Sequence, residues 1–195
     1  MANKLRAFRD YSEHDVINLF AHIDSAVDNG IVVKLNTITH WNTSGWHNDD
    51  DLNQLSMLGD VGNAYRNTTS ERYGVSARVE NCDADALPLG MTLYQVAEED
   101  ENGEKLIYNP RKAAEMQVVV SGQAVPVVTK GLFLYDYGTA STAIAGYNAR
   151  VGANGTIITG GNGAIVGKWL GSSDSNGHAL LRLNVDMNTG SYHTG

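Results

Sequence analysis

The feature that most constrains the fold of this chain is the stretch Gln117–Leu134, which holds the longest run of β-branched apolar residues in the sequence. Valines predominate in Val118–Val120 and Val125–Val128, and their restricted χ1 angles favour a pleated sheet. Gly122 marks a turn between the two groups. We expect three short strands in succession in the middle of one sheet core. Pro126 cannot donate to a ladder, so its strand is expected at an edge or an unpaired position.

The acidic composition limits the classes of partner that the chain can bind. Fourteen Lys and Arg residues face 22 Asp and Glu residues, which gives a formal net charge of −8. General affinity for nucleic acid requires clustered basic side chains, so we expect no nucleic-acid partner. No run approaches the ~18–20 apolar residues of a membrane span. The start of the chain lacks the apolar region of a signal peptide, so we expect a soluble protein made in a cytoplasm, with no membrane partner.

The first 30 residues are expected to form an arm followed by a helix. Residues 1–11 are the only locally basic part of the chain. They are interpreted either as a frayed terminus or as an arm that docks on a partner. Ser12–Asn29 carries the strongest helix signal, since Ser12 can cap a helix and apolar residues follow at helical spacing. An extended segment over Asp15–Phe20 is the alternative.

A segment rich in aromatic and acidic residues follows the predicted strand Ile31–Thr39. It contains His40, Trp41, Trp46, His47 and Asp49–Asp51. The two histidines fit no compact metal motif, and the acidic triplet lacks the glycine and distal glutamate of a calcium loop. We therefore predict an aromatic-anchored loop with no metal. A sugar site remains the alternative, because aromatic rings beside carboxylates are what sugar sites use.

The rest of the chain predicts β structure with one helical turn. Thr92–Ala97 and Lys105–Tyr108 are expected to form a hairpin around Asn102 and Gly103. The acidic residues Glu98–Glu101 are interpreted as its solvated tip. Arg111–Met116 predicts one helical turn. Further strands are expected at Gly74–Val79, Thr156–Thr159, Ala164–Leu170 and Ala179–Val185.

These predictions divide the chain into four segments and a mainly β fold. An N-terminal arm and helix occupy 1–30, and a strand plus the Trp-rich loop occupy 31–85. The β core covers 86–186, and a short polar tail covers 187–195. The many glycines and few prolines, 21 and 3 respectively, suit short strands joined by glycine turns.

No pattern of catalytic or cofactor-binding residues is found in the sequence. Around Gly167 and Lys168, a phosphate loop would require glycine where Asn162 stands. The glycines near 160 do not complete a dinucleotide-binding fingerprint either. Cys82, the only cysteine, lies among Asp and Asn residues, a setting that does not favour a thiolate. We therefore expect no catalytic residue, no cofactor and no enzymatic activity.

Several blocks of the sequence carry a resemblance to a known class of proteins. Asp10–Leu35, Ala86–Val96, Glu104–Met116 and Val119–Gly131 resemble structural proteins of tailed bacteriophages. Ala164–Val185 is similar to the last hairpin of capsid decoration proteins, also called cement proteins. These blocks cover most of the chain.

The resemblance implies a β-tulip or β-sandwich-like domain that binds the exterior of the capsid in a virion and staples adjacent capsomers. The implied partners are the major capsid protein and further copies of the chain, with a homotrimer favoured. The residues expected to contact the capsid or another subunit are Leu5, Phe8, Tyr11, Trp41 and Trp46. The alternatives are a head-fibre or tail-associated structural module and a carbohydrate-binding protein.

Overall fold

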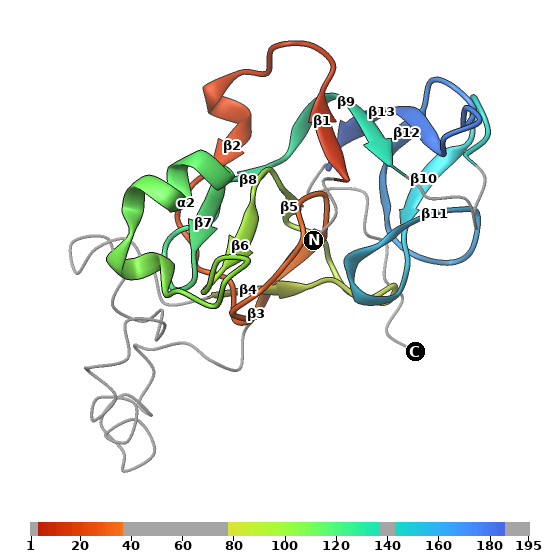
Figure 1. Cartoon of the computed structure of the whole chain (residues 1–195). Coiled ribbons are helices and arrows are strands. Elements are labelled where there is room, and N and C mark those ends of the chain that lie inside the picture. Colours follow the sequence, from red (N-terminus) through yellow and green to blue (C-terminus); the bar gives the residue numbers. More distant parts are fainter. Residues whose placement is uncertain (1–3, 37–77, 137–142, 186–195) are drawn as a thin grey trace, which may run out of the picture.

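Strands predominate in the part of the chain that the structure describes. The computed structural model describes residues 4–36, 78–136 and 143–185 (Figure 1). Within these ranges the strands form three sheets, and α2 (Pro110–Met116) is the only α-helix. The predicted mainly β, sandwich-like fold is confirmed.

The largest sheet has six antiparallel strands. Their order is β1 (Leu5–Ala7), β9 (Lys130–Asp136), β13 (His178–Asn184), β12 (Ile165–Trp169), β10 (Asn148–Val151) and β11 (Ile157–Thr159). β9 and β13 pair along their whole length, from Asp136 opposite His178 to Lys130 opposite Asn184. Leu181 and Leu183 are buried whereas Arg182 is exposed, so β13 is the half-buried strand that the alternating sequence predicts.

The second sheet has five strands and curls back on itself. Their order is β2 (Val16–Ile17), β8 (Val127–Val128), β5 (Gly90–Thr92), β3 (Val32–Asn36) and β4 (Arg78–Asn81). Beyond β2 the chain continues beside β8, where Ala21 bridges Ala124, and then beside β4, where His22 bridges Val79. The two edges of this sheet are therefore joined through residues 21–23.

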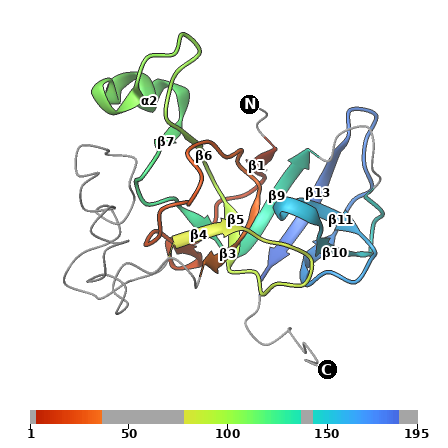
Figure 2. The ribbon, with the colours of Figure 1, turned by 90° about the horizontal axis from the view of Figure 1, so that it is seen from below.

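A third, smaller unit lies to one side of these sheets. β6 (Gln95–Ala97) and β7 (Val118–Val120) pair in parallel, and α2 packs beside them. Figure 2 shows α2 and β7 on the side away from the six-stranded sheet. The unit has a hydrophobic cluster of its own, formed by Ala97, Leu106, Ala113 and Val120.

The main hydrophobic core joins the two larger sheets. From the six-stranded sheet it takes Leu5, Phe133, Tyr135, Trp169, Leu181 and Leu183, and from the five-stranded sheet it takes Val32, Met91 and Val128. The ring centroids of Tyr135 and Trp169 are 6.0 Å apart. Each large side chain buried in this way contributes ~1.5–3 kcal/mol. The shared core explains why sheets assembled from distant parts of the chain pack as a sandwich.

The stretch Gln117–Leu134 forms three strands, as predicted, but its predicted place in one sheet core is wrong. β7, β8 and β9 each join a different sheet. The turn after β7 uses Gly122 at φ +88°, and Gly131 at φ +155° lies inside β9. Pro126 precedes β8, so it removes no ladder hydrogen bond.

The helix predicted over Ser12–Asn29 is wrong. Ser12 caps only a short 3-10 helix, Glu13–Asp15, and the chain then runs extended through β2. The carbonyl of Asp15 accepts from the amide of Thr129, and that of Phe20 accepts from the amide of Val125. The alternative of an extended segment after Asp15 is the one that forms, because pairing with β8 outweighs a helix signal that has no tertiary partner.

The predicted hairpin between Thr92–Ala97 and Lys105–Tyr108 is wrong for those strands, since antiparallel pairing is limited to a bridge between Glu99 and Lys105 near the predicted tip. Leu106–Tyr108 is a 3-10 helix, and β6 pairs with β7 instead. The tight turn itself forms, since the Asp100 carboxylate accepts from the amides of Asn102 and Glu104. The helical turn predicted after Asn109 is confirmed as α2, whose first turn is capped by the Asn109 side chain.

Candidate partner-binding surfaces

The structure places the predicted contact residues in three different settings. Leu5 is buried in the main core, Tyr11 is half-buried, and Phe8 is 51% exposed. Trp41 and Trp46 lie outside the described residues, together with the histidines and aspartates of their segment. Leu5 therefore holds the fold together, and of the predicted residues that are described Phe8 presents the most apolar surface.

The arm is built into the six-stranded sheet. β1 is an edge strand that pairs with β9, with Leu5 opposite Tyr135. On the other side of β1, the buried side-chain amide of Asn29 forms hydrogen bonds with the main chain, as a neighbouring strand would. Its Oδ1 accepts from the main-chain amide of Lys4 at 2.7 Å, and its Nδ2 donates to the carbonyl of Leu5 at 2.9 Å. The interpretation of a frayed terminus is wrong for residues 5–7, which pair with β9, and Asn29 also holds the outer edge at Leu5.

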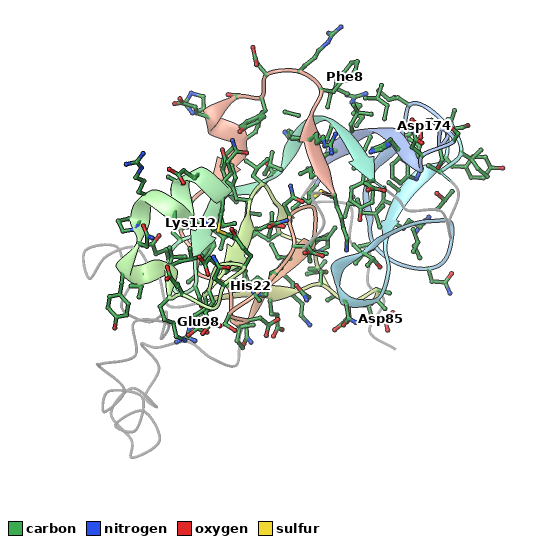
Figure 3. All side chains as sticks on the ribbon, in the orientation of Figure 1. Phe8, His22, Asp85, Glu98, Lys112 and Asp174 are labelled. Atoms are coloured by element: carbon green, nitrogen blue, oxygen red, sulfur yellow. The ribbon has the colours of Figure 1, made fainter. Side chains whose placement is uncertain are left out.

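The arm ends in an exposed surface that we call the arm surface, formed by Arg6, Phe8 and Arg9. All three side chains are exposed. Phe8 projects from the loop that follows β1 (Figure 3). Its main-chain amide donates to the carbonyl of Leu132 at 3.0 Å, which fixes the backbone beneath the ring. Aromatic rings and guanidinium groups are both enriched in protein interfaces.

Tyr11 fastens the loop that carries the arm surface. Its ring lies 6.0 Å from the ring of Phe133, centroid to centroid. Burial raises the pKa of the Tyr11 hydroxyl, and the charge and hydrogen bond of the neighbouring Tyr94 raise it further. Tyr11 is thus an anchor within the chain, while Tyr94 is 41% exposed.

Three further exposed apolar residues, Ile144, Tyr147 and Leu170, lie on neighbouring backbone segments, and we call them the apex patch. Their exposed fractions are 43%, 56% and 46%. Main-chain hydrogen bonds hold their backbone segments together, because the amide of Tyr147 donates to the carbonyl of Ile144 and the amide of Trp169, next to Leu170, donates to the carbonyl of Tyr147. The patch is therefore a rigid feature of the sheet, next to the start of β10 and the end of β12.

Sequence reasoning missed the apex patch. Ile144 and Tyr147 lie in small-residue sequence that was interpreted only as an exit from the β core. One usable signal is the alternation in β12, where Lys168 is exposed, Trp169 is buried and Leu170 is exposed. A large aliphatic residue on the solvent side of a predicted strand can mark a contact surface.

The two surfaces lie at separate places on the six-stranded sheet. The arm surface follows β1, and the apex patch lies beside β12, three strands away in the order β1, β9, β13, β12. Three strand spacings amount to about 14 Å. Figure 3 labels Phe8 on the β1 side and Asp174 on the turn between β12 and β13.

The buried groups Cys82 and His22 are held by contacts within the fold. Burial raises the pKa of the Cys82 thiol to about 12, and the thiol contacts the carbonyl of Asp83 at 3.4 Å. Burial lowers the pKa of His22, whose Nδ1 accepts from the amide of Asp24 at 3.0 Å and whose Nε2 lies 3.2 Å from Asn81 Oδ1.

The charge of the acidic loop Glu98–Glu101 is partly offset by two lysines. Lys105 pairs with Glu98 and with Glu99, and Lys112 of α2 pairs with Glu101 at 2.7 Å. Figure 3 labels Glu98 and Lys112 in this region. These groups are exposed, so the pairs contribute little to stability. Across residues 4–36, 78–136 and 143–185, no three His, Cys, Asp or Glu side chains are grouped to hold a metal ion. No helix in these ranges has the length and apolar character needed to cross a bilayer.

Comparison with known proteins finds no matching family model and no similar curated sequence.

Proposed function

We propose that this chain is a structural virion protein that binds the outer surface of an icosahedral phage head and staples adjacent capsomers against internal DNA pressure. The observation that supports this proposal most is the presence of two exposed apolar surfaces on one sheet. A staple needs two contact surfaces held at a fixed separation. The arm surface and the apex patch meet that requirement, because pairing through β9 and β13 fixes their distance.

The mechanism of such a staple is mechanical. The arm surface offers one large apolar side chain and the apex patch three, so a single contact is modest in energy. Full burial of a side chain such as Phe8 contributes ~1.5–3 kcal/mol, and its half-exposed state leaves about 1 kcal/mol to be gained at an interface. Many copies on one shell act together, because bound neighbours raise the effective concentration of every further contact.

The charge of the chain suits a position outside the shell. A net charge of −8 repels packaged nucleic acid and keeps a crowded exterior surface soluble. The partners in this proposal are the major capsid protein and other copies of the chain, with a trimer favoured. Sedimentation equilibrium of the purified chain measures the copy number directly.

The proposal is tested with expanded heads that lack the protein, taken from the virus whose genome encodes it. Purified protein is expected to co-sediment with these heads saturably and to raise the temperature at which they rupture. Phe8→Ser and Tyr147→Ser are each expected to weaken binding about fivefold, since about 1 kcal/mol corresponds to that factor. Tyr108→Ser is the matched control, because Tyr108 is 82% exposed but belongs to neither surface.

Failure to co-sediment with the heads, with rupture temperature unchanged, contradicts the proposal. Binding confined to a vertex or to tails points instead to a head-fibre or tail-associated module. If Tyr108→Ser weakens binding as much as Phe8→Ser does, the contact surfaces have been assigned to the wrong residues.

A further inference from the structure

A groove runs past Tyr94, on the flank of the molecule between the arm and α2. It consists of two hollows of about 340 and 430 Å³ that share Tyr94 and Gln117 as lining residues. Arg6 and Tyr11 line the first hollow, and Asn18 and Gln123 line the second. The two hollows are adjacent, because they border the same two side chains.

The chemistry of the groove is neutral and polar. Asn18, Gln117 and Gln123 are exposed amides for which the described residues provide no hydrogen-bond partner. Among the described lining residues there is no carboxylate and no histidine, and Arg6 is the one charged group. The absence of carboxylates from the described lining is notable in a chain with a net charge of −8. Such a lining offers no ligand set for a metal ion and too little positive charge for a polyanion.

The exposed part of the lining also lacks aliphatic anchors. The exposed lining side chains are Arg6, Ala7, Asn18, Tyr94, Ala114, Gln117 and Gln123. Peptides and protein surfaces gain most of their affinity from large apolar side chains in apolar pockets. Sugars need something different, namely paired donors and acceptors for adjacent hydroxyls and an aromatic ring for the C–H face. An amide supplies both hydrogen-bonding functions, and Tyr94 supplies a ring.

The backbone at Gln117 supplies an independent observation. Gln117 ends α2 in the left-handed conformation, with φ of 54°. Glycine is the usual residue at this position of a helix end, because a Cβ atom is unfavourable there. The chain carries glutamine instead, with its side chain exposed and lining both hollows. Non-glycine residues in this backbone region cluster at binding sites, so the conformation of Gln117 supports a role for the groove.

We propose that this groove binds a neutral oligosaccharide, with Tyr94 as the stacking ring and with Asn18, Gln117 and Gln123 as hydrogen-bonding groups. None of these four residues belongs to the arm surface or the apex patch, which are the surfaces proposed for attachment to a head, although Arg6 of the arm surface also lines the first hollow. Oligosaccharide binding would give a particle that carries many copies a weak but multivalent affinity for glycan-coated surfaces.

The test begins with an array of immobilised neutral and charged oligosaccharides, probed with the purified chain. We expect binding to a neutral class, with isothermal titration calorimetry of the best ligand giving a dissociation constant for each variant. Tyr94→Ala is expected to weaken binding at least tenfold. Tyr108→Ala is the matched control and should leave the dissociation constant unchanged.

The decisive variant is Gln117→Gly. It relieves the left-handed backbone, so the midpoint of thermal unfolding should rise while oligosaccharide binding falls at least tenfold. A variant that is more stable yet binds less cannot be explained by misfolding. The proposal is overturned if Gln117→Gly and Tyr94→Ala both bind oligosaccharide as the wild type does. It is also overturned if the wild type binds no neutral oligosaccharide on the array.

Head binding is measured for the same variants to separate the two proposals. Tyr94→Ala and Gln117→Gly should co-sediment with heads as the wild type does. If they lose head binding and the wild type binds no sugar, the groove holds a peptide segment of the shell. That result overturns the oligosaccharide proposal and leaves the attachment proposal standing.

Discussion

Gly155 is the residue at which the packing of the two large sheets can be tested most sharply. It ends the 3-10 helix Ala153–Gly155, between β10 and β11 of the six-stranded sheet. Its amide donates to the carbonyl of Cys82 at 2.6 Å, just beyond β4 of the five-stranded sheet. A Cβ atom added to Gly155 would overlap the carbonyl oxygen of Val32 and lie 2.5 Å from the Ile31 side chain.

Gly155→Ala should therefore be costly for two separate reasons. Gly155 has φ of +71°, and a Cβ atom in the left-handed region costs roughly 1–2 kcal/mol. Overpacking against the rigid backbone of β3 costs a further ~1–3 kcal/mol. The expected loss in free energy of unfolding is their sum, about 2–5 kcal/mol. Gly160→Ala isolates the first term, since Gly160 has φ of +88° and nothing within 4 Å of its added Cβ.

The assay is urea unfolding of the wild type, Gly155→Ala and Gly160→Ala at one protein concentration, followed by circular dichroism. We expect Gly155→Ala to lose about 1–3 kcal/mol more than Gly160→Ala, or roughly 2–4 °C of melting temperature for each kcal/mol of that difference. Equal losses in the two variants would refute the reasoning, because they would show that the loop does not press against β3.

Three further predictions concern buried polar groups. The Cys82 thiol should resist alkylation at pH 8 in the folded protein and react fully in urea, because its pKa is raised to about 12; fast labelling without denaturant would contradict its burial. Burial lowers the pKa of His22 in the folded state, so its contribution to the free energy of unfolding should be complete above pH 6.5 and should decrease as the pH falls below that value. Thermal melts from pH 5 to 8 should show a weaker pH dependence for His22→Gln. If the pH dependence of the melting temperature is the same in His22→Gln as in the wild type, another titrating group is responsible for it. Asn29→Ala should cost about 2–3 kcal/mol and speed amide exchange at Phe8, because β1 loses the side chain that holds its outer edge; unchanged exchange at Phe8 would show that β9 alone holds the arm.

The parts of the fold that could be predicted have local signals. β13 alternates buried leucines with exposed polar residues, and α2 begins with Asn109 as cap and Pro110 in the first turn. Both signals act within a few residues, so they can be interpreted without knowing the partner of the segment. The mainly β class follows from the same kind of evidence, repeated along the chain.

The failures concern pairing between distant segments. Residues after Ser12 have helical spacing of apolar side chains, yet the amide of Thr129 bonds the carbonyl of Asp15 across more than one hundred positions. The sequence pattern around Asp15 carries no information about its pairing with Thr129. The valine stretch shows the same limit, since it predicts strands but does not show that β7, β8 and β9 join three sheets.

The candidate surfaces were predictable in part. Phe8 stands out as an aromatic residue in a basic, polar arm, and the structure exposes it. Leu5 is also a large apolar residue in this arm, but it is buried, because successive side chains of a strand point to opposite faces and Leu5 of β1 points into the core. Tyr94 and Gln117 could not be grouped from sequence, since a groove between the arm and α2 exists only once the sheets are assembled.

The central claim, attachment outside a virus head at two surfaces, is tested most directly by electron cryo-microscopy of heads reconstituted with the purified chain. Our account predicts density on the exterior that bridges neighbouring capsomers, with Phe8 and Tyr147 of each copy against the shell or an adjacent copy. Density inside the shell, at the tail alone, or joined to a single capsomer with both side chains facing solvent would contradict it.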